Sequence, residues 1–520
     1  MSIFDQRRQA ANVLLTVRDE VSSLAHLLQT NDPPSDSEVE QIVPLLRAVD
    51  NEIARFKPQD IDPNFKAIVY DPLKSLHAAL RGALSALRSL PSEILSQIFS
   101  ACMPVASDDH DGTSWNNLDI TSAPWTLVQV SRRWRETALA DQKLWSRIKV
   151  DSWALAAEGK PEPTPPKLVA CLARSGEHPL SIDFRDRYPS IFGSNLPLLT
   201  HLMAYAERWT FLKLAVSFKY LEFMSPIKGR LPELQELVIQ AAGPSTFSIY
   251  DVFEVAPNLR SAALAVDDPS APLSISAAFL KEGPHIIKLP WAQLTSLAID
   301  SFEVLAHAPQ LLSCQLNFTS SSHAPRNHPV VKHTAMRTLF SNLASILNFL
   351  ETPSLESLTV FSGGEVDALS QIVAFLSRSS CPLKFLHLIG LTVKNESDLR
   401  LLLQLVPTLV SLEISFGSVA WNMVARTLTI TPQSHLAPNL ATISFSFAQT
   451  DVDPEILLRT LESRCMMQDG EDTKRLRHLA LFSVPSTPRG QLMLLLRRLE
   501  ELGLKVTTNA LGDRAIEDQS

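Results

Sequence analysis

The sequence predicts an α plus α/β fold, in which a helical N-terminal part precedes an irregular repeat solenoid. Three observations predict it. Apolar residues recur with helical spacing over about the first 90 residues, a short amphipathic helix follows the Leu-Pro step at 90–91, and one leucine-containing phrase recurs through the second half. Because the phrase recurs about every 30 residues, its copies are expected to stack as neighbouring units of one array.

The first 76 residues are expected to form helices that pack together. The polar segment 31–38 separates two apolar runs, and within it Ser35 and Glu38 resemble a capping box. The simplest arrangement is a helical hairpin whose apolar stripes face each other, and a coiled-coil dimer formed through the same stripes is the alternative. Three runs have the spacing of a helical stripe: Leu14, Val17, Val21, Leu24 and Leu28; Val39, Ile42, Leu46, Val49 and Ile53; and Leu73, Leu76, Leu80, Leu84 and Leu87.

Residues 90–103, LPSEILSQIFSACM, are expected to form a helix with one broad apolar face. Pro91 suits the first turn of a helix, and Glu93 lies where the helix dipole favours an anion. A polar and acidic loop is expected at 105–123. Apolar residues with helical spacing return in the segment 124–151, which the Leu-Trp pair at 144–145 closes.

Residues 77–151 resemble an F-box. The resemblance rests on the order and spacing of LPSEILSQIF, WTLVQVSRRWRETA and the Leu-Trp pair, and it is closest to fungal F-box proteins with a helical region before the box. It implies a trihelical module that docks on a Skp-family adaptor and, through it, on a cullin. The alternative is that these apolar side chains pack only within the chain. Carried over by position, the adaptor-binding residues are Leu90, Pro91, Ile94, Leu95, Ile98, Phe99, Val130, Trp134, Leu144 and Trp145.

The recurring phrase of the second half is Pro-x-Leu-x-x-Leu-x-(Leu/Ile/Val). Its spacing predicts a turn that runs into a short strand, and helical stretches are expected between phrases at 336–351, 366–379 and 396–407. The pattern resembles leucine-rich repeats, although its intervals range from 17 to 44 residues. An ordinary α/β domain is the alternative. The anchoring leucines are Leu234, Leu259, Leu294, Leu311, Leu355, Leu383, Leu409, Leu440 and Leu476.

These patterns divide the chain into five parts. We expect an N-terminal helical or coiled-coil region at 1–76, the F-box at 77–151, a linker rich in Pro, Glu and Lys at 152–177, a leucine-rich-repeat-like domain at 178–505 and a tail at 506–520.

Composition excludes several classes of function. The net charge of −8 argues against a broad nucleic-acid footprint, and the five scattered cysteines argue against a disulfide framework or a zinc finger. No apolar run is long enough for a membrane span, and the N-terminus lacks the apolar core of a secretory signal. A cytoplasmic or nuclear protein with no nucleic-acid or membrane partner is therefore expected.

No catalytic, cofactor-binding or metal-binding motif is found. Phosphate-cradling loops, HExxH and GxSxG are absent from the sequence. His323, His328 and His333 are five residues apart, which is not the spacing of metal ligands on a helix.

The expected function follows from the two resemblances. The protein is expected to be a non-enzymatic, substrate-recruiting subunit of a cullin-based (SCF-type) ubiquitin ligase, in which the repeat domain binds an unknown target protein. The alternative is an interaction scaffold that uses the same parts outside a ligase.

Overall fold

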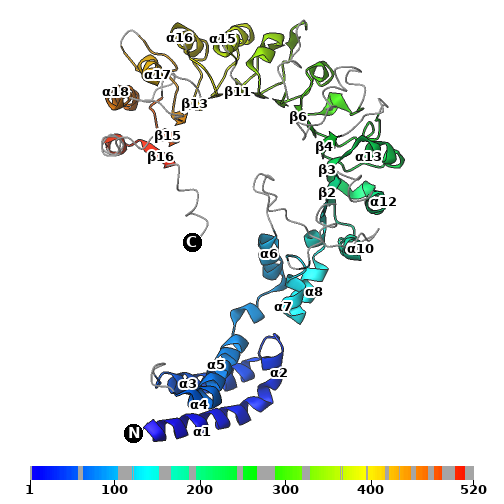
Figure 1. Cartoon of the computed structure of the whole chain (residues 1–520), viewed down its shortest axis with the longest axis vertical. Coiled ribbons are helices and arrows are strands. Elements are labelled where there is room, and N and C mark those ends of the chain that lie inside the picture. Colours follow the sequence, from blue (N-terminus) through cyan, green and yellow to red (C-terminus); the bar gives the residue numbers. More distant parts are fainter. Residues whose placement is uncertain are drawn as a thin grey trace. The chain divides into compact units, whose positions relative to one another are not determined.

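A computed structural model gives the structure of this protein (Figure 1). The residues that it describes are 3–56, 62–103, 120, 122–151, 166–186, 195–242, 250–265, 287–318, 328–362, 365, 367–393, 396–415, 421–431, 434–446, 453–466, 474–482 and 498–509. Most of the expected acidic loop at 105–123, His323 and most of the expected tail at 506–520 lie outside these residues.

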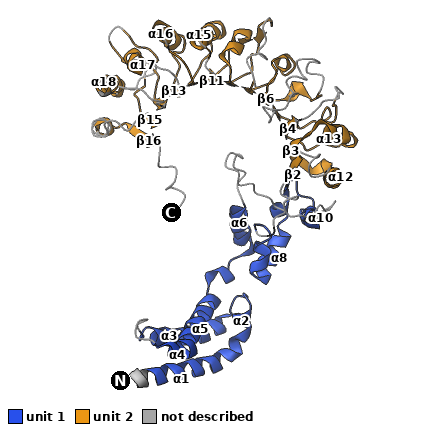
Figure 2. Cartoon of the chain, in the orientation of Figure 1, with its two compact units in different colours: residues 1–151, 159–183 blue, residues 152–158, 184–520 orange. Residues whose placement is uncertain are grey.

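The chain forms two compact units (Figure 2). Unit 1 contains residues 1–151 and 159–183, and unit 2 contains residues 152–158 and 184–520. Unit 1 thus extends past residue 151 and takes in residues 159–177 of the expected linker.

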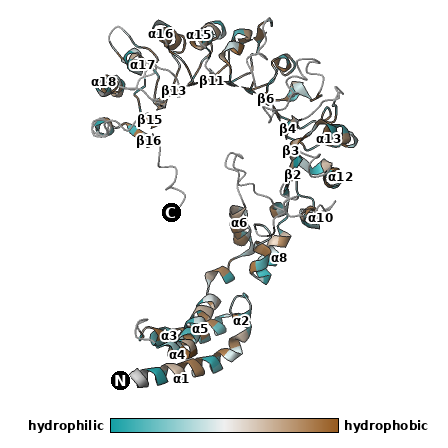
Figure 3. Cartoon of the chain, viewed as in Figure 1, coloured by the Kyte–Doolittle hydropathy of each residue, from teal (hydrophilic) through white to brown (hydrophobic). Residues whose placement is uncertain are grey.

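Unit 1 begins with a helical bundle. Its helices are α1 (Ile3–Val21), α2 (Ala25–Gln29), α3 (Asp36–Ile53), α4 (Pro63–Phe65) and α5 (Asp71–Ala83), with a π-helical turn η3 (Lys66–Tyr70) before α5. Hydrophobic and hydrophilic residues alternate along these helices (Figure 3), as expected for amphipathic helices. The apolar stripes meet in one core, which contains Val17, Val21, Leu24, Ile42, Val49, Leu73 and Leu80. The stripes are therefore buried against one another within a single chain.

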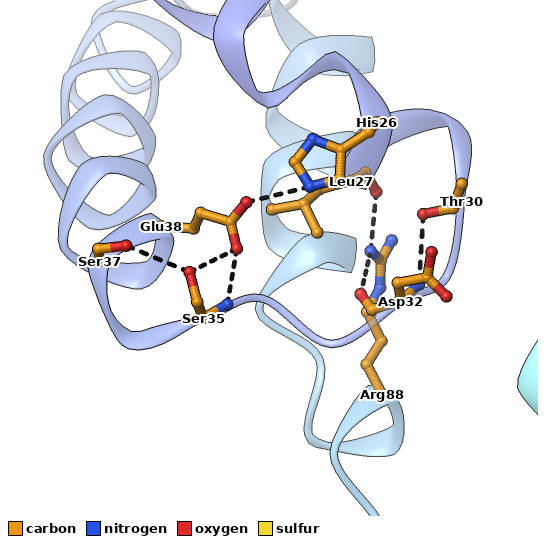
Figure 4. Close-up of polar contacts among 8 residues, drawn as sticks. All are labelled: His26, Leu27, Thr30, Asp32, Ser35, Ser37, Glu38 and Arg88. Atoms are coloured by element: carbon orange, nitrogen blue, oxygen red, sulfur yellow. Dashed lines mark hydrogen bonds and ion pairs between the residues drawn. The ribbon is translucent and has the colours of Figure 1, made fainter.

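A polar network holds the start of α3 (Figure 4). The Glu38 carboxylate accepts hydrogen bonds from the backbone N–H and the hydroxyl of Ser35, both at 2.7 Å. These bonds lower the pKa of Glu38, and His26 Nε2 lies 3.0 Å from the same carboxylate. The predicted pairing of Ser35 with Glu38 is thus present at the N-terminus of α3.

One parallel sheet of 14 strands dominates the rest of the chain. Its strands follow one another in sequence order, without reversal, and β1 and β16 are its two ends. A second, two-stranded sheet pairs β8 (Val331–Lys332) with β10 (Leu350–Glu351). The strands of the large sheet are β1 (Arg147–Asp151), β2 (Leu180–Asp186), β3 (Trp209–Ser217), β4 (Glu236–Ala242), β5 (Ser261–Ala265), β6 (Ser296–Ile299), β7 (Ser313–Leu316), β9 (Thr338–Ser341), β11 (Ser357–Phe361), β12 (Phe385–Ile389), β13 (Ser411–Ser415), β14 (Thr442–Ser446), β15 (His478–Phe482) and β16 (Lys505–Asn509).

The recurring phrase determines where most of these strands begin. Each of its nine anchoring leucines is fully buried just before a strand, from Leu234 before β4 to Leu476 before β15. Side chains then alternate between the two faces of the sheet. In β11, for example, Leu358 and Val360 are buried, and they are in register with the buried Leu386 and Leu388 of β12.

Helices connect many of the strands in unit 2. Figure 1 shows the strands side by side along the inner side of an arc, with the helices along its outer side. This is the layered arrangement that parallel strands require, because each crossover must return over one face of the sheet. The longer helices are α12 (Leu196–Met203), α13 (Phe218–Phe223), α15 (Ala368–Ser379), α16 (Glu396–Leu405), α17 (Trp421–Leu428) and α18 (Pro454–Cys465).

The fold-class prediction is wrong. In place of a trihelical F-box followed by an irregular leucine-rich-repeat solenoid, the chain has one large parallel sheet with helices, an α/β architecture. The sheet begins with β1, inside the segment 77–151 that we expected to be helical, and it continues through β2 before the first of the nine phrases. In β2, Leu180, Ile182 and Phe184 alternate with half-buried residues. The sheet extends beyond the nine phrases because its strands pair with strands far away in the sequence, and the spacing of the phrases does not predict this pairing.

Two of the three expected helical stretches are confirmed, and the third is wrong. Helices α15 and α16 lie within the stretches at 366–379 and 396–407. The stretch at 336–351 instead contains β9, the short 3-10 helix η12 (Ala344–Phe349) and β10. The Glu365 carboxylate accepts hydrogen bonds from the backbone N–H groups of Ala344 (2.6 Å) and Ser345 (3.3 Å), which stabilises the start of η12.

Candidate functional site

The candidate site lies in the second part of unit 1. Helix α6 (Ser92–Cys102) begins after Pro91, and Glu93 is in its first turn. Helices α7 (Leu127–Val130) and α8 (Arg132–Ala140) follow, and the 3-10 helix η5 (Gln142–Trp145) leads into β1. The hydroxyl of Ser131 accepts a hydrogen bond from the backbone N–H of Trp134 at 3.1 Å, so Ser131 is the N-cap of α8.

A small core holds these helices together. The Phe99 ring of α6 packs against the Trp134 ring of α8, with their centroids 4.9 Å apart. Trp145 is fully buried, and its Nε1–H donates a hydrogen bond to the Ala138 carbonyl at 2.8 Å. Trp125 packs edge-on against Trp145 at 5.1 Å. The aromatic residues of this segment therefore form its own core.

The structure divides the predicted adaptor-binding residues into two groups. Four of them, Leu95, Phe99, Leu144 and Trp145, are buried, at 2% exposure or less. Their assignment to a binding surface is corrected here: they pack within unit 1 and are not accessible to a partner in this structure.

The other predicted residues lie at the surface. Ile94 is 39% exposed and Val130 is 51% exposed. Pro91 is also exposed, and Leu90, Ile98 and Trp134 are half-buried. Ile94 and Ile98 are four residues apart on α6, and Pro91 directly precedes the helix. The two isoleucines form one stripe beside the buried stripe of Leu95 and Phe99. Helix α6 thus has an inward stripe and an outward stripe, and both are apolar.

Polar contacts that the sequence did not predict join this segment to the helical bundle. The Arg133 guanidinium donates hydrogen bonds to the backbone carbonyls of Arg88 and Leu90, and Asn31 Nδ2 donates one to the Val130 carbonyl at 3.2 Å. One basic residue of the RRWR run is therefore used to fix the backbone around the start of α6. Arg132 pairs with Glu136 at 2.9 Å, which also argues for a structural use of this run.

Arg88 extends the same connection to α2 and to the turn that follows it (Figure 4). Its Nη1 donates hydrogen bonds to the carbonyls of Leu27 (2.8 Å) and Asp32 (3.3 Å). Burial lowers the pKa of Arg88. The only sequence signal for these contacts is an arginine beside an apolar stripe, which does not identify its acceptors.

A helix from the expected linker also packs here. Helix α10 (Pro166–Arg174) lies inside the segment 152–177 that we expected to be a connector. Its last residue, Arg174, lies over the Trp145 ring at 4.4 Å and over the Trp125 ring at 4.8 Å. The guanidinium thus joins α10 to the aromatic core behind the candidate surface.

We expect Arg174→Ala to lower the stability of unit 1 by about 1–2 kcal/mol, because it removes a cation that stacks on two indole rings. Arg174→Lys is expected to lose less, since it keeps the charge but not the planar stacking surface. Hydrogen exchange of the α10 amides in the full chain measures the effect. Exchange rates equal to those of the wild type in both variants would show that these stacked contacts contribute nothing.

The described residues offer little for covalent chemistry. They contain no group of three or more His, Cys, Asp or Glu side chains that is arranged to hold a metal ion. Burial raises the pKa of the Cys171 and Cys314 thiols to about 12, and that of Cys381 to about 11, so these thiols remain protonated and unreactive. His333 is buried with Nε2 2.9 Å from the Ala308 carbonyl, a structural role.

The sequence matches no family model, and no curated protein is found to resemble it.

Within the described part of the chain, no helix has the length and hydrophobicity needed to cross a membrane.

Proposed function

We propose that this protein is a substrate-recruiting subunit of a cullin-based ubiquitin ligase. In this proposal, the surface of α6–α8 docks on a Skp-family adaptor, and unit 2 binds a target protein. The chain itself makes and breaks no bond; it brings its target close to a ubiquitin-loaded enzyme held by the same assembly, and proximity supplies its contribution to catalysis. The assembly would act in the cytoplasm, the nucleus or both.

One observation carries the proposal: Ile94 on α6 and Val130 on α7 expose large apolar side chains on a small helical segment that has an aromatic core of its own. Half-buried Leu90, Ile98 and Trp134 accompany them. A segment of this size gains stability by burying such side chains, so leaving them exposed favours a partner surface. The resemblance of residues 77–151 to F-boxes indicates which partner to test.

Co-purification of the full chain with a Skp-family adaptor and a cullin tests the proposal. Recovery of both is the expected result. Recovery of the adaptor without the cullin would favour the alternative of an interaction scaffold, and recovery of neither would overturn the proposal.

A further inference from the structure

Backbone hydrogen bonds join a row of residues that directly precede the strands β7, β9, β11 and β12. In this row, each N–H donates a 2.8 Å hydrogen bond to the carbonyl of the residue one strand earlier; the donors are Leu312, Arg337, Glu356 and Lys384. The four residues are therefore register neighbours on adjacent strands. We give the name rim to this row together with the first residue of β12: Leu312, Arg337, Glu356, Lys384 and Phe385.

The rim is accessible because two successive residues lie outside the core at each of these strand starts. On β9, for example, Arg337 and Thr338 are exposed and lie between a buried methionine and a buried leucine. The side chains at the two ends of the rim are large and apolar: Leu312 is 44% exposed and Phe385 is 50% exposed. Single exposed apolar side chains are common on protein surfaces, so the case for a binding site depends on the charges that accompany them.

Three charged side chains lie along the rim between Leu312 and Phe385. The Glu356 carboxylate pairs with Arg337 Nη1 and with Lys384 Nζ, at 2.8 Å each, and the Lys384 hydrogen bond lowers the pKa of Glu356. Glu356 is therefore ionised at neutral pH, and the three side chains carry one excess positive charge. Arg337 is 64% exposed and uses Nη1 in this pair, so its other guanidinium N–H groups can bind a second carboxylate.

Neighbouring strand starts add to the positive charge. From β5 to β14, the last residue before each described strand and the first residue within it include three cationic side chains and one carboxylate: Arg260, Arg337 and Lys384 against Glu356. The excess of two positive charges contrasts with the net charge of −8 for the whole chain. The next described carboxylate at a strand start is Glu236, on β4. The rim therefore favours an acidic ligand.

The sheet sets the length of a segment that could cover the rim. Three strand spacings separate β7 from β12, roughly 14 Å at ~4.8 Å per strand. An extended chain rises about 3.4 Å per residue, so its first and fifth residues are about this far apart. Alternate residues of an extended chain point to the same side, so the first, third and fifth side chains can contact the rim together.

We propose that the rim binds an extended segment of the target protein with the pattern apolar-x-acidic-x-apolar. Its two bulky apolar side chains contact Leu312 and Phe385, and its carboxylate binds the Arg337 guanidinium. The inference deepens the target-binding role of unit 2 and rests on it.

Fluorescence anisotropy with the full chain tests the proposal. The probe is a labelled Gly/Ser peptide of about twelve residues with Leu-Ser-Glu-Ser-Phe at its centre. A second probe has these five residues in reverse order, because the rim can accept either chain direction. Saturable binding of at least one probe is expected, and absence of binding by both would overturn the proposal.

Matched peptides test the pattern. In the probe that binds, replacing Glu by Gln removes the charge and replacing Phe by Ser removes one apolar contact; each change is expected to weaken binding at least tenfold. A third peptide, with Leu-Glu-Ser-Ser-Phe at its centre, keeps the composition but turns the carboxylate away from the side that Leu and Phe share. It is also expected to bind at least tenfold more weakly. Binding of any of these peptides as tight as that of the probe would overturn the proposal.

Matched variants of the protein locate the site. Arg337→Gln and Phe385→Ser are each expected to weaken probe binding at least tenfold. Leu401→Ser on α16, where the side chain is 45% exposed, and Arg459→Gln on α18, where an exposed arginine also pairs with a carboxylate, are expected to leave binding unchanged. Equal losses in the test and control variants would overturn the assignment.

Glu356→Gln tests the charge of the rim in the opposite direction. The variant removes the carboxylate that competes with the ligand for Arg337 and Lys384, so it is expected to tighten binding of the acidic probe roughly threefold or more. The probe with Gln in place of Glu is expected to show no such gain. Weaker binding of the acidic probe by Glu356→Gln would overturn the charge assignment.

Two further measurements separate this inference from its alternatives. A wild-type protein that binds the probe but not the adaptor would count against the proposed ligase role alone, and one that binds the adaptor but neither probe would overturn the rim inference alone. Sedimentation of wild type and Phe385→Ser is expected to give the same oligomeric state. A wild-type dimer that dissociates in Phe385→Ser would show that the rim binds a second copy of the chain, which would overturn the proposal.

Discussion

Ile94→Asp is expected to weaken binding of the full chain to a Skp-family adaptor at least 100-fold, or about 2.7 kcal/mol. Ile94 is exposed on α6, so a carboxylate at this position remains solvated in the free protein and unit 1 keeps its fold. In an apolar interface the same carboxylate would lose its hydration without gaining a partner. Isothermal titration calorimetry with the purified adaptor measures the change.

Leu15→Asp is the matched control for this variant. Leu15 lies on α1 and is 61% exposed, so the substitution places the same charge on another exposed apolar position of unit 1. It is expected to leave adaptor binding unchanged. If Ile94→Asp binds the adaptor as tightly as the wild type does, α6 does not face the adaptor and the proposed docking surface is wrong.

Trp145→Ala is expected to destabilise unit 1 by about 3–5 kcal/mol, because it removes a fully buried indole and leaves a cavity. It also leaves the Ala138 carbonyl without its 2.8 Å donor and removes the ring on which Arg174 stacks. Hydrogen exchange of the α8 amides in the full chain measures the loss. Adaptor binding is expected to fall only to the extent that unit 1 unfolds.

Trp145→Phe separates packing from hydrogen bonding. The variant keeps most of the ring but loses the Nε1–H donor, and it is expected to cost about 1–2 kcal/mol. A folded Trp145→Ala variant with wild-type exchange rates but no adaptor binding would contradict the structural role and restore Trp145 to the binding surface.

Periodicity identified the strands of unit 2 well because it is a local property. A leucine such as Leu355 is followed closely by apolar residues at alternate positions, and this spacing is enough to predict a turn and a short strand. The prediction of a helix at 336–351 was wrong because periodicity is local. The apolar residues of this stretch satisfy helical spacing, yet Phe340 belongs to a strand and Leu347 to a 3-10 helix. Pairing of β9 with β7 and β11 overrode the local pattern.

The candidate site shows a second limit of sequence reasoning. Leu95 and Phe99 lie beside Ile94 and Ile98 on α6, and all four are large and apolar. The resemblance to an F-box placed all four on one binding face, whereas the structure buries Leu95 and Phe99 and leaves Ile94 exposed and Ile98 half-buried. The Trp134 ring that packs against Phe99 comes from a segment more than 30 residues further along the chain.

The sequence by itself determined the helices of the N-terminal bundle, the helical start at Pro91 and the strands that follow the recurring leucines, because each depends on residues within one or two turns of one another. The tertiary structure alone decided that β1 and β2 join a single 14-stranded sheet, that α10 packs through Arg174, and which apolar faces remain exposed. These features depend on backbone pairing and side-chain packing between segments far apart in the chain. A local sequence pattern does not identify the distant segment with which a strand pairs or against which a side chain packs.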